Sequence, residues 1–104
     1  MAQVRWTEPA LDDLRAIVDF ISRDSATYAA RLAQKIVEAP RRLATLPRIG
    51  AKVPEFDRDD IRELAVRPYR IPYAIRGDEC LVLAVIHGSR ELSHLVDLDN
   101  LPGE

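Results

Sequence analysis

The spacing of apolar residues changes once along this chain of 104 residues, from a helical period to a strand period. Up to about residue 46 the apolar positions recur every three to four residues, and from residue 62 they alternate. Such a change favours helices in one layer and a mainly antiparallel sheet in another. We therefore expect one α+β domain over residues 1–104, a length that can bury a core without disulfides or metal.

Two helices are predicted after a short strand at residues 3–6. Thr7 can cap the first helix, Pro9 suits its first turn, and the apolar pattern continues to about residue 23. Asp24 and Ser25 break the pattern and start a second helix, so the pair should form an antiparallel hairpin. Pro40 lies inside this second helix and should kink its last turns. Its apolar stripe is the strongest periodic signal in the sequence: Tyr28, Leu32, Ile36, Ala39, Leu43 and Leu46.

The second half predicts a loop at residues 47–60 and a three-stranded meander at residues 62–67, 69–76 and 80–87. Gly77 and Asp78 form a tight turn, and the last strand is apolar at every position before His87, as in a central strand. Pro72 lies in the middle strand and cannot donate to a ladder. We therefore expect a bulge or a missing pair at Pro72, with Tyr73 still packed inward.

Composition excludes several classes of function. Asp and Glu number 17 against 15 Lys and Arg, so the net charge of −2 argues against direct nucleic-acid binding by the whole surface. The thirteen arginines still allow a local cationic site. Cys80 is expected to be a buried free thiol, and no zinc-ligand spacing or glycine-rich phosphate loop is present, so no metal or cofactor is expected. With no membrane-length apolar run and no signal peptide, the chain is expected to be cytoplasmic.

Four segments in order carry a family resemblance: WTEPALDDLRAIVDFIS, LATLPRIGAKVPEF, RELAVRPYRIPYAI and LAVIHGSREL. Together they cover about residues 3–92, and they resemble the ParE/RelE superfamily of toxins from type II toxin–antitoxin systems. The resemblance implies an N-terminal strand and an antiparallel helical hairpin packed on a small, mainly antiparallel sheet. Three residues depart from the family pattern: Pro40, Pro72, and Ser89, where an arginine is common.

The resemblance implies one of two activities. ParE-type members poison DNA gyrase, whereas RelE-type members cut messenger RNA in the ribosomal A site, and a cognate antitoxin neutralises both. The P-Y-R and H-G-x-R-x-L segments are closer to ParE-like members. The favoured hypothesis is a gyrase inhibitor, not an enzyme, that forms a hetero-oligomer with its antitoxin. The alternatives are a RelE-type endoribonuclease and a weakly toxic member that only binds its antitoxin.

The same resemblance suggests site residues. Arg70 and Arg90 lie at positions similar to the arginines of RelE-type nucleases, and His94 is the nearest substitute for their missing terminal tyrosine. On the gyrase hypothesis the target-binding residues are Arg67, Arg70 and Arg90. The antitoxin should bind the apolar arcs of the helices, at Leu14, Ile17, Ile21, Tyr28 and Leu32.

Each of these residues also has a structural interpretation. Arg70 can pair with an acidic neighbour on the sheet, and His87 can be a hydrogen-bonded residue at the end of its strand. Tyr69 and Tyr73 are expected in the core rather than in a catalytic site.

Overall fold

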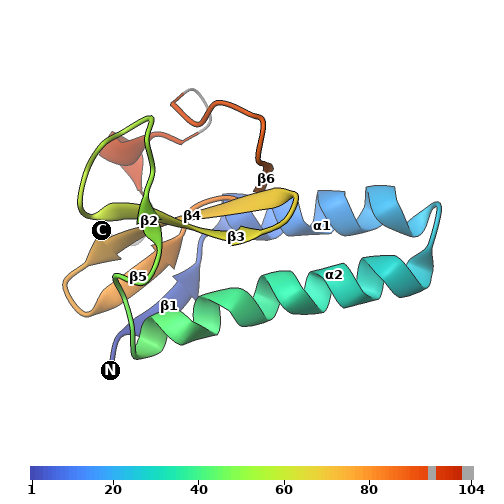
Figure 1. The fold of residues 1–104 in the computed structure, drawn as a ribbon, viewed down its shortest axis with the longest axis horizontal. Helices are drawn as coiled ribbons and strands as arrows, with labels where there is room; N and C mark the ends of the chain where they lie inside the picture. The colour runs from blue at the N-terminus through green and yellow to red at the C-terminus, as the bar shows by residue number, and fades with distance from the viewer. Residues whose placement is uncertain (94–95, 102–104) are drawn as a thin grey trace.

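The computed structural model describes residues 1–93 and 96–101. Figure 1 shows a helical hairpin that extends to the right beyond a small sheet. The C-terminal arm (residues 89–93 and 96–101) lies on the opposite side of the sheet from the helices. The predicted α+β fold is confirmed. The elements in order are β1 (Gln3–Trp6), α1 (Glu8–Ser22), α2 (Ala26–Glu38), the 3₁₀ helix η1 (Ala39–Ala44), β2 (Ala51–Lys52), β3 (Ile61–Val66), β4 (Tyr69–Arg76), β5 (Glu79–Val82), β6 (Ile86–His87) and the 3₁₀ helix η2 (Leu98–Asn100).

The predicted caps define both helices of the hairpin. The Thr7 hydroxyl accepts the Ala10 N–H at 3.3 Å, and the Ser25 hydroxyl accepts the Tyr28 N–H at 3.1 Å. The second helix is shorter than predicted, since it ends at Glu38 and continues as η1. Pro40 lacks the N–H that another α-helical turn needs, which explains the change to a 3₁₀ helix.

The sheet order is β1-β5-β4-β3-β2. Strands β3, β4 and β5 form the predicted antiparallel meander, and β1 adds parallel to β5 with Val4 opposite Cys80. Two predictions were wrong in detail. The loop at residues 47–60 contains the short strand β2, and the single strand predicted at residues 80–87 is split into β5 and β6, both paired with β4.

Pro72 explains the split. On the β3 side the ladder is regular, with Pro72 opposite Glu63. On the other side the register shifts between the Tyr73–Val82 and Arg70–Ile86 pairs, so residues 71–72 lie opposite residues 83–85. The Pro72 carbonyl accepts the Leu83 N–H at 2.9 Å, but Pro72 has no N–H to return. The predicted bulge is therefore confirmed, and Tyr73 is fully buried.

Thr7, which caps α1, and Asp13 within α1 form hydrogen bonds with backbone groups in the interrupted part of the sheet. The Thr7 hydroxyl lies 2.9 Å from the Val82 carbonyl oxygen and 3.3 Å from that of Leu83. The Asp13 carboxylate accepts the Val85 N–H at 3.0 Å. The N-terminal half of α1 is thus hydrogen-bonded to the interrupted part of the sheet, which fixes the hairpin on that face.

The core has a layer on each face of the sheet. On the hairpin side, residues of both helices pack against Ile71, Val82 and Val85. On the other side, the buried Leu92 brings the C-terminal arm onto β3, β4 and β5, and Val96, Leu98 and Leu101 pack beside it. Tyr28 and Leu46, predicted in the buried stripe of the second helix, are each 54% exposed. Tyr28 lies near the hairpin tip, and Leu46 follows the end of η1. Only the middle of the stripe is therefore buried.

Candidate functional site

Arg70 lies at the centre of a cluster of charged side chains on the arm side of the sheet. Its guanidinium binds Glu55 with two hydrogen bonds, from Nη2 to Oε1 at 2.7 Å and from Nη1 to Oε2 at 2.8 Å. Its Nε donates to Glu63 on β3 at 2.6 Å. Arg70, Glu55 and Glu63 have side chains only 16%, 15% and 19% exposed. The predicted pairing of Arg70 with an acidic neighbour on the sheet is confirmed.

This cluster also holds the start of the C-terminal arm. Arg70 Nη1 donates to the Arg90 carbonyl at 3.1 Å, and Glu55 Oε2 accepts the Leu92 N–H at 3.0 Å. The hydrogen bonds from Arg70 lower the pKa of Glu55 from its ordinary value of 4.5 to about 2, despite the opposing effect of burial. The same contacts raise the pKa of Arg70. One guanidinium between two carboxylates leaves this cluster with a formal net charge of −1.

Among the described residues, the side chains of the other two predicted cations form no ion pair with this cluster. Arg67 is exposed in the turn between β3 and β4, and the side chain of Arg90 is exposed where the arm begins. The structure therefore brings the Arg70 guanidinium to the backbone of residue 90 and does not gather three free cations into one site. His94 lies outside the described residues.

His87 and the two tyrosines have structural contacts. His87 is exposed, and its Nδ1 lies 2.8 Å from the Ser89 hydroxyl, which confirms the predicted hydrogen-bonded role. The Tyr69 ring meets the His87 ring edge-on, with centroids 6.1 Å apart. Tyr73 donates to the Pro47 carbonyl at 2.6 Å, and burial raises its pKa. Tyr73 is a core residue as predicted, and Tyr69 is half-buried against the core.

Two residues of this region were not singled out from the sequence. Glu55 lies in the segment predicted as a loop, 15 positions before Arg70, and the family resemblance included it only as part of LATLPRIGAKVPEF. Asp13 lies in the predicted first helix, where no role was assigned to it. Its pKa is raised by burial, while its bond from Val85 and the positive charge of Arg90 act in the opposite direction.

The residues predicted to bind an antitoxin differ in exposure. Leu32 is buried in the core, and Leu14, Ile17 and Ile21 are half-buried against the same cluster. Tyr28 alone of this set is exposed. The helices therefore use their apolar arcs mainly to pack against the sheet.

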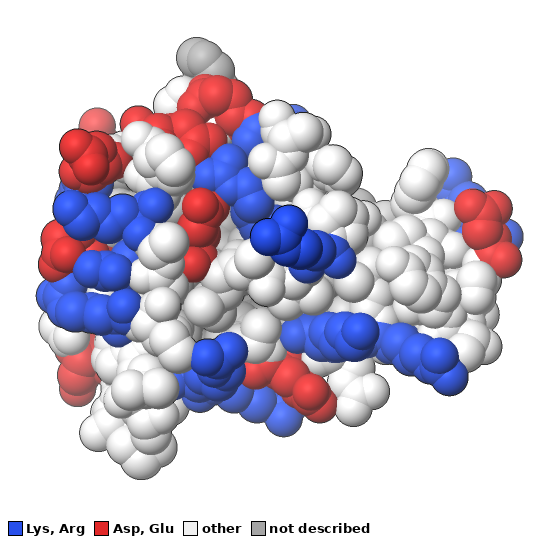
Figure 2. Space-filling model, viewed as in Figure 1, with Lys and Arg blue, Asp and Glu red and all other residues white. Residues whose placement is uncertain are grey.

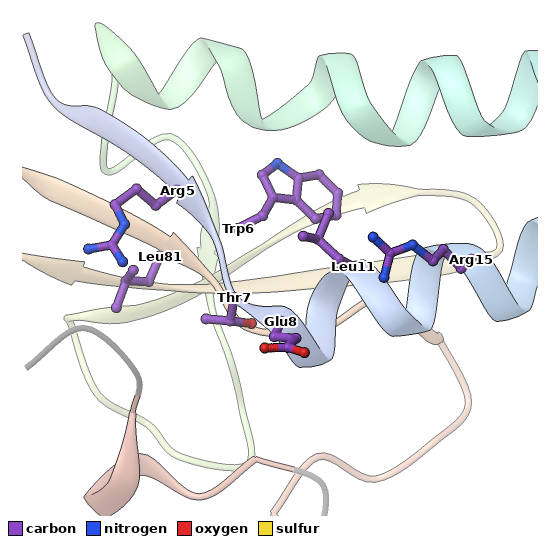
Figure 3. A pocket seen from close by; sticks show the side chains of 7 residues that line it. All are labelled: Arg5, Trp6, Thr7, Glu8, Leu11, Arg15 and Leu81. Carbon is purple, nitrogen blue, oxygen red and sulfur yellow. The ribbon is translucent and has the colours of Figure 1, made fainter.

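Figure 3 shows a pocket of about 410 Å³ between the end of β1 and the first turns of α1. Trp6 and Leu11 form part of its wall, with Arg5 and Arg15 nearby. Both arginines are engaged, because Arg5 pairs with Glu79 at 2.9 Å and Arg15 with Asp12 at 3.2 Å. The described ranges contain no group of three or more side chains suited to a metal ion. They also contain no helix with the length and apolar character needed to cross a bilayer.

Comparison with known proteins identifies the family. Residues 4–92 match the family described as the ParE toxin of the type II toxin–antitoxin system parDE. This chain belongs to that family. The predicted membership of the ParE/RelE superfamily is therefore confirmed, and with it a role as the toxin of a type II toxin–antitoxin pair.

Individual relatives of this ParE-family toxin carry both names of the superfamily. A curated protein named Toxin RelE2, from Caulobacter vibrioides, is 36% identical over 91 residues, which are 86% of this chain and 99% of that protein. Toxin ParE3 of the same organism is 26% identical over 94 residues, 89% of this chain and 93% of that protein. A solved structure titled as the chromosomal ParDE TA system from P. aeruginosa superposes with a TM-score of 0.70 at 29% identity, covering 84% of this chain and 96% of that one.

Proposed function

We propose that this toxin inhibits DNA gyrase and that a cognate antitoxin holds it inactive in a hetero-oligomer. The observation that carries the choice of target is the pairing of Arg70 with two glutamates. Cleavage of RNA through its 2′-hydroxyl requires cations that stabilise the charge of the phosphorane. Here the arginine at the position similar to a nuclease arginine is neutralised, and the cluster around it has a formal charge of −1. A negatively charged cluster repels the phosphate backbone that a nuclease must hold.

In this proposal Arg70 is a positioning residue. Its bond to the Arg90 carbonyl, together with the Glu55 bond to the Leu92 N–H, places the start of the arm on the sheet. The Arg90 side chain then remains exposed at this point, and Arg67 is exposed at the β3–β4 turn. We assign the contact with gyrase to these two exposed arginines, with Arg70 acting through the backbone that it holds. Gyrase acts on chromosomal DNA, so we expect a toxin that inhibits gyrase to act in the cytoplasm.

Gyrase supercoiling of relaxed plasmid tests this proposal. Purified toxin should block the formation of supercoiled plasmid, and an equimolar amount of the cognate antitoxin should restore it. Because the antitoxin binds only the folded toxin, it should also raise the melting temperature of the toxin. Supercoiling that continues at a large molar excess of folded toxin over gyrase would show that gyrase is not the target.

Ribosome-dependent cleavage of mRNA is the second candidate, because the relative at 36% identity is named RelE2. On this alternative Arg90 and His94 would supply the charge stabilisation and the proton transfer that Arg70 cannot. Cleavage of ribosome-bound mRNA would distinguish this activity from gyrase inhibition.

A further inference from the structure

The two arms of the helical hairpin carry opposite charges. Helix α1 contains four carboxylates and one arginine, a formal net charge of −3. Helix α2 and the 3₁₀ helix η1, which continues it, contain four cations and one carboxylate, a formal net charge of +3. All four cations are exposed, and we call them the α2–η1 ridge: Arg31, Lys35, Arg41 and Arg42. A chain with a net charge of −2 thus concentrates positive charge on one continuous segment.

The ridge does not hold the hairpin together. Among the described residues no ion pair joins α1 to α2, and none includes a cation of the ridge. Glu38 is the one carboxylate of this segment, and it accepts a hydrogen bond from Gln34 at 3.1 Å. The single arginine of α1 pairs within its own helix, with Asp12. The positive charge of the ridge is therefore available to a partner.

The buried face of the same segment fixes the direction of the ridge. Five residues of α2 and η1 are buried: Ala29, Leu32, Ile36, Pro40 and Leu43. The cations lie at the positions between these residues, so they line the outer surface of the hairpin. Figure 2 shows a row of Lys and Arg side chains along α2, which lies below α1 in Figure 1. From Arg31 to Arg42 the ridge is about 18 Å long, at about 1.5 Å per residue in α2 and about 2 Å in η1.

We infer that the α2–η1 ridge binds the phosphate backbone of the duplex DNA that gyrase holds. A length of about 18 Å matches about five base pairs at 3.4 Å each, so four cations along it can reach successive phosphates. Such contacts position the toxin on the duplex without reading its sequence. The negatively charged cluster around Arg70 does not oppose this contact, because it lies on the arm side of the sheet, opposite the hairpin. The inference rests on the proposed function for the enzyme that holds the DNA, whereas binding to the duplex alone does not require gyrase.

The other exposed side chains of α2 favour a phosphate backbone over an acidic protein. Thr27, Ala30 and Gln34 are small or polar, and Thr and Gln are among the side chains that hydrogen-bond phosphate oxygens. A protein partner gains most of its affinity from large side chains seated in apolar pockets. Within the described residues Tyr28 is the one large apolar side chain exposed on α2, and it lies before the first cation of the ridge. Separate cations along a polar surface suit a polymer that carries a charge on every unit.

Binding of a duplex of about 20 base pairs, followed by fluorescence anisotropy in the absence of gyrase, tests the ridge. Nonspecific phosphate contacts predict a Kd of about 10⁻⁴–10⁻⁶ M. Each neutralised phosphate contributes about −0.9 to the slope of log K against log salt, so four contacts predict a slope of about −3.6. A rise from about 50 to about 200 mM salt should then weaken binding about 100-fold.

The double variant Arg41→Gln/Arg42→Gln should lose half of this salt dependence. Its slope should fall to about −1.8, so the same rise in salt should weaken binding only about tenfold. Arg41→Lys/Arg42→Lys should keep the wild-type slope, because the slope depends on charge. The matched control Arg15→Gln/Arg58→Gln removes the same charge from outside the ridge and should also keep it. A wild-type toxin that does not bind the duplex, or equal slopes in the two Gln variants, would overturn the inference.

A competition experiment separates DNA from an acidic protein as the partner. Unlabelled duplex should displace labelled duplex from the toxin at a lower concentration than a poly-glutamate peptide of about 20 residues does. A peptide that displaces the label at the lower concentration would assign the ridge to an acidic protein and overturn the inference.

Gyrase supercoiling of relaxed plasmid separates this inference from the proposed function. The Arg41→Gln/Arg42→Gln toxin should require about fivefold more protein for half-inhibition, because it loses two contacts with the DNA. A variant that inhibits as well as wild-type toxin would overturn the inference and leave the proposed function standing. Wild-type toxin that binds the duplex with the steep slope but does not inhibit gyrase contradicts the proposed function and leaves the DNA-binding role of the ridge standing.

Discussion

Glu55→Gln is the substitution that most sharply tests how the C-terminal arm is held. The change keeps the shape of the side chain and removes the charge that receives two hydrogen bonds from Arg70. A carboxyl whose pKa falls from 4.5 to about 2 gains about 3 kcal/mol in its charged form. Because 15% of the side chain still faces solvent, we expect Glu55→Gln to lower the free energy of unfolding by about 2 kcal/mol at pH 7.

The dependence on pH identifies the cause. Since the folded-state pKa lies below the ordinary value, the contribution of Glu55 is present above pH 4.5 and is lost as the pH falls from 4.5 towards 2. Urea unfolding at a series of pH values should therefore show the two proteins converging in this window. Asp57→Asn is the control, because it removes an exposed carboxylate from the same loop. A loss of stability that stays constant from pH 7 to pH 2.5, or no loss at all, would refute the assignment.

Three further substitutions follow from the same contacts. Thr7→Val removes the cap of α1 and the hydroxyl beside the Leu83 carbonyl, and should cost about 1–2 kcal/mol in urea unfolding. Asp13→Ala leaves the buried Val85 N–H without its acceptor and should lower the free energy of unfolding by about 1–3 kcal/mol. Asp13→Asn keeps an acceptor oxygen and should lower it clearly less. Equal losses in the two variants would contradict the role of this hydrogen bond. Arg90→Ala removes an exposed charge and should raise the toxin concentration for half-inhibition of gyrase about fivefold, without changing the melting temperature by more than a few degrees.

The main architecture could be predicted because local signals agree with it. Thr7 and Ser25 are strong caps, the helical and strand periods are clear, and Pro72 interrupts a ladder in any sheet. These features depend on the residue itself and its near neighbours. The hairpin, the meander and the bulge were therefore all available from the sequence.

The charged cluster depends on contacts that are distant in sequence. Nothing near Arg70 shows that Glu55 will fold over it, because the loop that carries Glu55 has no periodic pattern. The split between β5 and β6 was hidden for a related reason. The consequence of Pro72 appears on the neighbouring strand, where residues 83–85 are apolar and look like an uninterrupted strand. An apolar arc on a helix likewise predicts that its residues favour burial, but it does not say which of them the sheet covers. Leu32 and Tyr28 belong to the same stripe, yet Leu32 is buried and Tyr28 is exposed.

Primer extension on ribosome-bound mRNA tests the choice of target most directly. The toxin is added at the concentration that fully blocks gyrase supercoiling, and the mRNA is mapped for breaks at the A-site codon. Because Glu55 and Glu63 neutralise Arg70, we predict intact mRNA. His94→Ala should leave gyrase inhibition unchanged. Cleavage of the A-site codon that His94→Ala or Arg90→Ala abolishes would contradict the gyrase proposal and assign this toxin to the ribonucleases.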